Sequence, residues 1–111
     1  MQNNTRVIYV KVAGVTFEGR QEYLKALLGD EPVKIVPEPD NKFDPNALAV
    51  HIAVNGSVLH CGYIPKDLAA EIAPLLDGED IMASIDSVWG GGGYNWGLKL
   101  RVEIPTDDAP F

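Results

Sequence analysis

Residues 47–64 read ALAVHIAVNGSVLHCGYI, and this stretch decides the fold class. From residue 48 to residue 54 every second position is a large apolar residue, which is typical of a strand with one buried face. Asn55-Gly56 follows and is a strong signal for a two-residue hairpin turn, because both central residues of a type I′ turn need positive φ. The returning strand is expected over residues 58–64. The stretch therefore predicts an antiparallel β-hairpin.

Four further segments carry the apolar alternation or β-branched content of strands, at residues 6–13, 32–37, 80–88 and 96–104. Together with the hairpin they make six strands joined by short connections. This order predicts a mainly β or α+β fold, a small six-stranded OB-like or SH3-like β-barrel with two short helices.

The two helices are expected between the strands. The first spans residues 18–28, where apolar residues recur at helical spacing ahead of a glycine. The second opens at Pro65, whose missing N–H costs nothing there, and closes at Gly78. Pro74 lies inside it and is expected to weaken or end the last turn. The glycine run at residues 90–93 is expected to form a flexible loop.

The size and composition of the chain fit one globular domain, with 111 residues of which 46% are apolar. We expect that domain to span residues 1–104, followed by a polar tail at residues 105–111. No apolar run has the length of a membrane helix, and the first residues lack the pattern of a secretory signal. The expected location is therefore the cytoplasm.

The charge balance argues against a strongly basic nucleic-acid binder. Nine Lys and Arg residues against sixteen Asp and Glu residues give a net charge of −7 at pH 7. Proteins that hold DNA through its phosphates usually present a basic surface, because Lys and Arg displace condensed counterions. An acidic chain can bind nucleic acid at a local site, but steering by the whole-molecule charge opposes it.

Metal and catalytic chemistry have little support. Structural zinc needs four Cys or His-type ligands, and the chain has only His51, His60 and Cys61. His60 and Cys61 are neighbours on a strand and face opposite sides, which favours a buried thiol over a nucleophile. The glycine run lacks the Lys-Ser/Thr and helix of a phosphate loop, and Asp40 and Asp44 are more simply turn residues. We expect no enzyme, no metal and no cofactor.

Aromatic residues near loops are the remaining functional candidates. They are Phe17, Phe43, Tyr63, Tyr94 and Trp96, and the basic residues near them are Arg20, Lys42, Lys66, Lys99 and Arg101. Single-strand binders stack bases on such rings, each base contributing roughly 1–3 kcal/mol. Composition alone favours core packing for these rings, although Phe43 stands out in the polar loop of residues 37–46.

Three blocks of the sequence resemble the HIRAN domain family. They are VAGVTFEGRQ at residues 12–21, EPDNKFDPNALAV at residues 38–50 and GYIPKDLA at residues 62–69. The blocks occur in order, and the resemblance covers roughly residues 6–104. It implies a small OB-like barrel. In eukaryotes such domains are attached to Swi/Snf-class DNA-dependent ATPases of replication-fork repair, where they recognise the 3′ end of single-stranded DNA.

The resemblance also implies a site in which aromatic rings stack on the terminal bases and an aspartate meets the 3′-hydroxyl. Carried over by position, Phe17 is the first aromatic, Phe43-Asp44 is the loop pair, Tyr63 is the polar ring and Tyr94 is the aromatic of the last loop. Thr16 departs from the pattern, because a well-studied animal domain has a phosphate-holding arginine at that position.

The sequence therefore predicts a nucleic-acid-binding module whose partner is single-stranded DNA or a DNA end, in a DNA-repair setting. Its expected site residues are Thr16, Phe17, Lys42, Phe43, Asp44, Tyr63, Lys66, Tyr94 and Arg101. The alternative is a protein-interaction or adaptor module that uses the same groove without DNA. The acidic charge, the missing arginine and the isolated architecture favour it. The hydrolase and helicase activities of relatives reside in domains that this chain lacks, so we do not expect them here.

Overall fold

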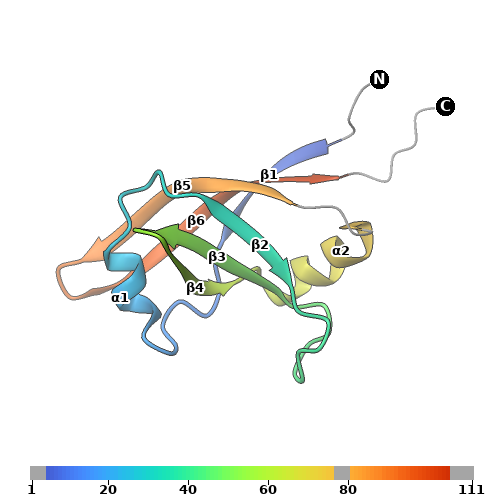
Figure 1. Ribbon diagram of the computed structural model, residues 1–111, viewed down its shortest axis with the longest axis horizontal. Helices are drawn as coiled ribbons and strands as arrows, with labels where there is room; N and C mark the ends of the chain where they lie inside the picture. The colour runs from blue at the N-terminus through green and yellow to red at the C-terminus, as the bar shows by residue number, and fades with distance from the viewer. Residues whose placement is uncertain (1–4, 77–80, 106–111) are drawn as a thin grey trace.

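The computed structural model describes residues 5–76 and 81–105, which form six strands and two short helices (Figure 1). The elements follow in the order β1 (Thr5–Lys11), α1 (Arg20–Lys25), β2 (Val33–Pro37), β3 (Leu48–Val54), β4 (Ser57–Tyr63), α2 (Lys66–Leu76), β5 (Met82–Gly91) and β6 (Tyr94–Pro105). No helix in these two ranges is long and apolar enough to cross a membrane.

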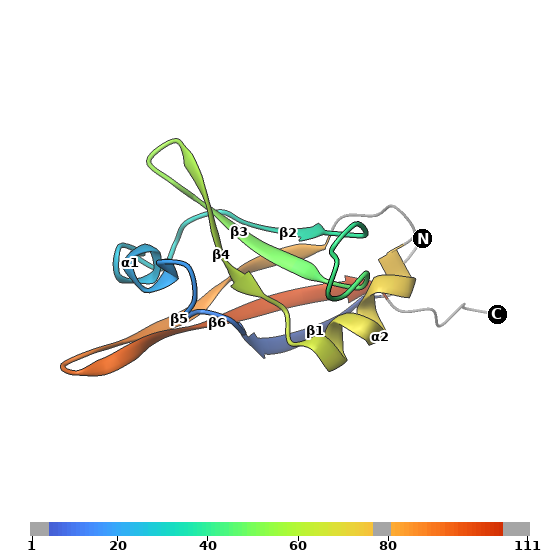
Figure 2. The same ribbon diagram turned by 90° about the horizontal axis from the view of Figure 1, so that it is seen from below.

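The strands form one antiparallel sheet in the order β1-β6-β5-β2-β3-β4, and this sheet curls into a half-barrel (Figure 2). An isolated β-bridge, just beyond the end of β1, joins the two outer edges of the sheet, which are β1 and β4. The N–H of Ala13 donates to the Tyr63 carbonyl at 2.8 Å, and the N–H of Tyr63 donates to the Ala13 carbonyl at 2.9 Å. This arrangement confirms the predicted mainly β, barrel-like fold with two short helices.

Gly62 makes this closure possible. It has a φ of 152°, and a Cβ built on it would lie 2.5 Å from the Ala13 carbonyl oxygen. A larger residue would push the two backbones apart, so the joint between the ends of the sheet depends on a glycine at this position.

The core fills the concave side of the sheet. It contains the alternating residues that the sequence marks as inward-facing, among them Val50, Ile52, Leu98 and Leu100. Cys61 is also fully buried there, as the sequence predicts, and burial raises the pKa of its thiol to about 11. The thiol is therefore protonated and inert at neutral pH.

The first helix is shorter than predicted. It spans Arg20–Lys25 instead of residues 18–28. Glu18 and Gly19 have left-handed backbone conformations, with φ of 54° and 76°, so no right-handed turn can begin before Arg20. The periodic apolar pattern cannot reveal this, because the break lies in the backbone conformations of Glu18 and Gly19.

The second helix continues through Pro74 to Leu76, so of the two expected effects, weakening or ending the helix, this proline does not end it. A proline displaces the carbonyl of the residue four positions earlier. Here that residue is Ala70, which is exposed like Pro74, so water can take the freed hydrogen bond. Gly78, the predicted end, lies outside the described residues.

The last two strands form a longer hairpin than predicted, and only Gly92 and Gly93 turn at its end. The indole of Trp89 covers Gly97 on the opposite strand, and the indole of Trp96 lies against Gly90. These rings supply the packing surface that glycines lack. Half of the expected glycine loop, Gly90 and Gly91, is therefore strand, and the hairpin projects from the barrel (Figure 2).

Candidate nucleic-acid interface

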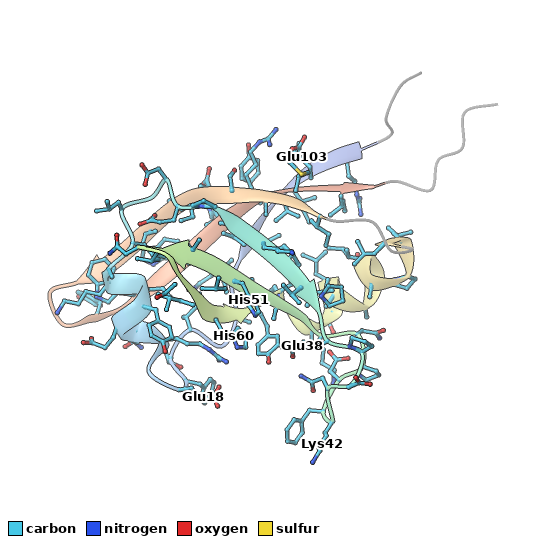
Figure 3. The ribbon with its side chains drawn as sticks, in the orientation of Figure 1. Glu18, Glu38, Lys42, His51, His60 and Glu103 are labelled. Carbon is cyan, nitrogen blue, oxygen red and sulfur yellow. The ribbon has the colours of Figure 1, made fainter. Side chains whose placement is uncertain are left out.

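A groove of about 950 Å³ opens at one end of the half-barrel. Its lining side chains come from residues 13–20 after β1, residues 41–47 before β3, and residues 63–66 between β4 and α2. Figure 3 shows the first two segments, marked by Glu18 and Lys42, projecting on the same side of the molecule. Three segments far apart in the sequence thus form one concave surface.

The side chain of Asn41 organises the loop before β3. Its Oδ1 accepts hydrogen bonds from the N–H groups of Phe43, at 2.9 Å, and Asp44, at 3.0 Å. Asp44 in turn accepts from the N–H of Asn46 at 2.9 Å. These are the local bonds expected of Asn and Asp in turns. They fix the backbone on which Phe43, 94% exposed, extends into solvent.

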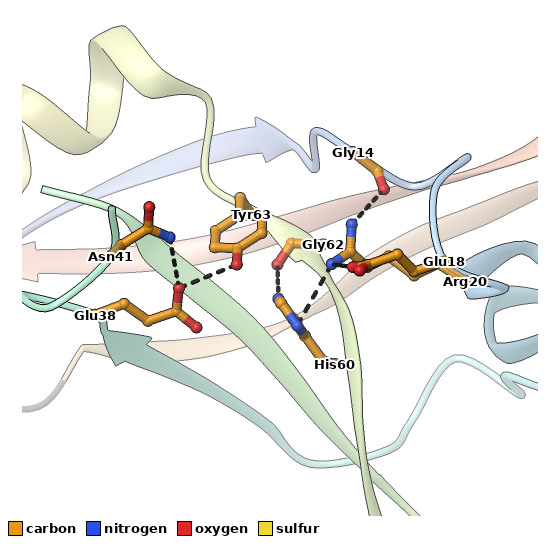
Figure 4. Close-up of polar contacts among 8 residues, drawn as sticks. All are labelled: Gly14, Glu18, Arg20, Glu38, Asn41, His60, Gly62 and Tyr63. Carbon is orange, nitrogen blue, oxygen red and sulfur yellow. Dashed lines mark hydrogen bonds and ion pairs between the residues drawn. The ribbon is translucent and has the colours of Figure 1, made fainter. Parts of the chain in front are cut away.

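Glu38 fastens this loop to β4. Its Oε1 accepts from the Asn41 Nδ2 and from the Tyr63 hydroxyl, both at 3.0 Å (Figure 4). Burial raises the pKa of Tyr63, and the hydrogen bond to Glu38 and the charge of Glu38 raise it further. Tyr63 therefore stays protonated and acts as a fixed hydrogen-bond donor.

The opposite wall is organised by Arg20, which is only 5% exposed. Its Nη1 donates to the Gly14 carbonyl at 2.9 Å, and its Nη2 pairs with the Glu18 carboxylate at 2.9 Å. The guanidinium also lies over the Tyr63 ring, 5.5 Å from the centroid. Arg20 thus ties both ends of the Gly14–Glu18 turn to β4 and holds Phe17 at the rim.

His60 lies beneath this wall, close to Arg20 (Figure 4). One ring nitrogen, Nε2, is 3.0 Å from the Gly62 carbonyl, and Nδ1 is 3.5 Å from the Arg20 Nη2. With Nε2 protonated, Nδ1 is left to accept from the guanidinium. Burial and the charge of Arg20 lower the pKa of His60, so the ring is neutral and supports the groove structurally.

Two phenylalanines border the groove, because the Phe17 side chain is 65% exposed on the turn after β1 and Phe43 extends from the other loop. The charged side chains of the lining are Glu18, Arg20, Asp44 and Lys66. Arg20 is engaged by Glu18, whereas no salt bridge within residues 5–76 and 81–105 engages Asp44. The groove therefore offers two aromatic faces and a carboxylate acceptor.

The structure brings five of the nine predicted site residues together on this groove: Phe17, Phe43, Asp44, Tyr63 and Lys66. Two others are adjacent to it. Thr16 is exposed beside Phe17, and Lys42 is exposed beside Phe43, but neither side chain lines the groove.

The last two predicted residues do not line the groove. Tyr94 is 82% exposed at the end of the β5–β6 hairpin. Arg101 lies on β6 opposite Tyr9 of β1, and its Nη1 pairs with Glu103 at 3.5 Å.

The sequence did not reveal that Glu38 and Asn41 hold the loop of the groove, or that Arg20 organises the opposite wall. An Asn between two prolines in a polar loop is a recognisable turn signal and could have pointed to Asn41. Arg20 has no such signal, because its contact with His60 spans 40 positions of sequence.

No group of three or more His, Cys, Asp or Glu side chains that could hold a metal ion is present in the part of the chain that the structure describes. The groove's chemistry is thus hydrogen bonding, aromatic contact and a few charges.

A curled six-stranded half-barrel with an aromatic-rimmed groove is the architecture of a small binding module. A model of the HIRAN domain family matches residues 5–103. The chain therefore belongs to the HIRAN domain family, whose members are binding domains and not catalytic ones, and this membership indicates nucleic-acid binding. The chain has no significant match among curated proteins or among solved structures.

Proposed function

We propose that this protein binds the free 3′ end of single-stranded DNA in the groove between Phe17 and Phe43. The observation that carries the proposal is that two exposed phenylalanine rings, on two separate turns, line the same groove as an acceptor carboxylate. Exposed rings of this size are costly to hydrate, and stacked bases would cover them.

Asp44 gives the proposal its end specificity. An ionised carboxylate only accepts hydrogen bonds, so a terminal 3′-hydroxyl is a suitable donor and a terminal 3′-phosphate is repelled. The Asp44 N–H is already bonded to Asn41, so the turn sets the direction of the side chain before a ligand arrives. Such preorganisation lowers the ordering cost of binding.

Phosphates further along the strand would meet the cations beside the groove. Lys66 is exposed and lines the groove, and Lys42 is exposed next to Phe43. Two contacts of this kind give a small electrostatic contribution and a shallow dependence of affinity on salt, as an acidic protein requires. We assign the stacking and the hydroxyl contact the larger share of the binding free energy.

The resemblance to domains of DNA-repair ATPases supports a repair setting for this activity. The proposed preference for a 3′ end and the proposed role in repair both depend on binding in this groove.

The test is fluorescence anisotropy at low salt with two strands of one sequence, one ending in a 3′-hydroxyl and one in a 3′-phosphate. The wild-type protein should prefer the hydroxyl strand by roughly tenfold, the size of one charge-assisted hydrogen bond plus one repulsion. Asp44→Asn removes the charge and should reduce this preference. Asp67→Asn, an exposed acid on α2 outside the groove, is the matched control and should leave it unchanged.

A protein-interaction module is the second candidate, and the net charge of −7 favours it. In that case the groove would take a basic peptide, with Asp44 and Glu18 as counter-charges. Equal or absent binding of both strands, together with binding of a short Arg-rich peptide that Asp44→Asn weakens, would replace the DNA proposal with this one.

A further inference from the structure

The convex outer face of the sheet, on the side away from the groove, carries a second group of aromatic and basic side chains. Along β1 the buried Val10 alternates with the exposed Tyr9 and Lys11. The register places Tyr9 opposite Arg101 and Lys11 opposite Lys99 on β6. In Figure 3 Glu103, from the same face, points to the opposite side of the molecule from Glu18 and Lys42.

This outer face concentrates the positive charge of an acidic protein. The described residues include nine Lys or Arg and eleven Asp or Glu. Four of the cations lie on the outer face, namely Lys11, Lys34, Lys99 and Arg101, and only two acids do, Glu103 and the bulged Asp86. The remaining described surface carries five cations against nine acids. The outer face is thus locally positive, and it suits an anionic partner.

The aromatic side chains on this face are exposed and stand among the cations. Tyr9 is 60% exposed and Trp89 is 40% exposed. The Trp89 indole packs against Gly97, and the Lys11 Nζ lies over the ring at 5.9 Å from its centroid, so a base that stacks on Trp89 would displace a flexible lysine. Aromatic rings interleaved with cations on an open sheet are the combination with which single-stranded nucleic acids are bound without sequence preference.

We propose that the outer face is a second contact surface for single-stranded nucleic acid, one that needs no strand end. Lys11, Lys99 and Arg101 would meet phosphates while Tyr9 and Trp89 stack on bases. The Arg101–Glu103 pair does not block this role, because both side chains are about two-fifths exposed and such a pair contributes little. This surface does not depend on end capture in the groove, since no residue of the groove lining belongs to it.

The experiment uses circular single-stranded DNA, which has no end for the groove to capture, and reads tryptophan fluorescence together with affinity. The wild-type protein should bind the circle in a salt-dependent manner, with a change in the emission of Trp89. Lys99→Glu exchanges an attraction for a repulsion, so it should weaken binding by roughly tenfold at low salt. Lys25→Glu makes the same charge change on α1, away from both surfaces, and is the matched control.

A second variant identifies the reporting ring. Trp89→Phe keeps an aromatic face over Gly97, so it should bind the circle with an affinity within about threefold of wild type. It should lose the fluorescence change, because Trp96 is partly buried on the other side of the hairpin. Polyglutamate as a competitor separates stacking from charge alone.

The outcomes separate this inference from the proposed function. Phe43→Ala should abolish the preference for a 3′-hydroxyl yet leave circle binding intact, whereas Lys99→Glu should do the reverse. Equal effects of Lys99→Glu and Lys25→Glu on circle binding would overturn the inference. So would competition by polyglutamate as strong as that by DNA, since the surface would then be a site for acidic peptides.

Discussion

Asn41→Ala tests whether the ordered loop of the groove is needed for binding, because this substitution should weaken binding more than it lowers the stability of the fold. The Asn41 side chain makes three hydrogen bonds, two from the N–H groups of Phe43 and Asp44 and one to Glu38. Each such bond contributes about 1 kcal/mol net, so the ordered loop loses up to about 3 kcal/mol. The loop is exposed, so water can replace some of these hydrogen bonds in the free protein. A ligand, however, must reorder the loop when it binds.

We therefore expect Asn41→Ala to weaken binding of a 3′-hydroxyl strand by roughly tenfold or more, equivalent to about 1.4 kcal/mol or more of reordering cost. The free energy of unfolding should fall by less than this, as measured by urea denaturation. Asn46→Ala is the control, because it makes the same change in the same loop but removes no side-chain hydrogen bond to the groove. Unchanged binding by Asn41→Ala, or equal losses in both variants, would refute the reasoning.

Three further predictions concern the framework beneath the groove. Gly62→Ala should lower the free energy of unfolding by about 2–4 kcal/mol, because the added Cβ meets the Ala13 carbonyl at a positive φ; a urea midpoint equal to wild type would contradict this. The pKa of His60 is lowered in the folded protein, so as the pH falls this residue takes up a proton in the unfolded chain before it does so in the fold. The free energy of unfolding should therefore decrease as the pH drops below about 6.5. His60→Gln should flatten that fall in urea titrations between pH 5 and pH 7, and an unchanged slope would show that another group is responsible. The Cys61 thiol, with a pKa of about 11, should resist iodoacetamide in the native protein and react in urea; rapid native labelling would mean that the core opens there.

The fold is largely predictable from the sequence because its information is local. The alternation from residue 48 to residue 54 and the Asn55-Gly56 turn encode the β3–β4 hairpin, and its register follows them from the turn to the His51–His60 pair, beyond which it shifts. The helix ends are not predictable in the same way. Glu18 is not a glycine, yet it adopts a left-handed conformation, and nothing in the apolar pattern of residues 18–28 marks that position as a break.

The groove was predictable in part, for a related reason. Phe43 could be singled out because a large aromatic is unusual in a polar loop, and Asp44 follows it directly. Tyr94 could not be placed, because the length of the β5–β6 hairpin depends on Trp89 and Trp96 packing over glycines of the opposite strand. That packing extends both strands and carries Tyr94 away from the groove.

Tyr9 illustrates the converse case, a functional candidate that sequence patterning hides. In the strand of residues 6–13 it is one β-prone residue among several, and nothing local marks it as exposed. Its partner Arg101 comes from another strand 92 positions away in the sequence, and Arg101 pairs in turn with Ser84 of a third strand. The outer-face surface becomes visible only when the register of the three strands is known.

The most direct test of end capture is to place 2-aminopurine, a fluorescent base analogue, at a single position of a short strand that ends in a 3′-hydroxyl. Stacking changes its emission, so the position of the change reports which base lies against the phenylalanine rings. We expect a large change for the 3′-terminal base, a small one for the 5′-terminal base, and loss of the large change in Phe43→Ala. Equal changes at both ends, or a 3′ signal that survives Phe43→Ala, would contradict it.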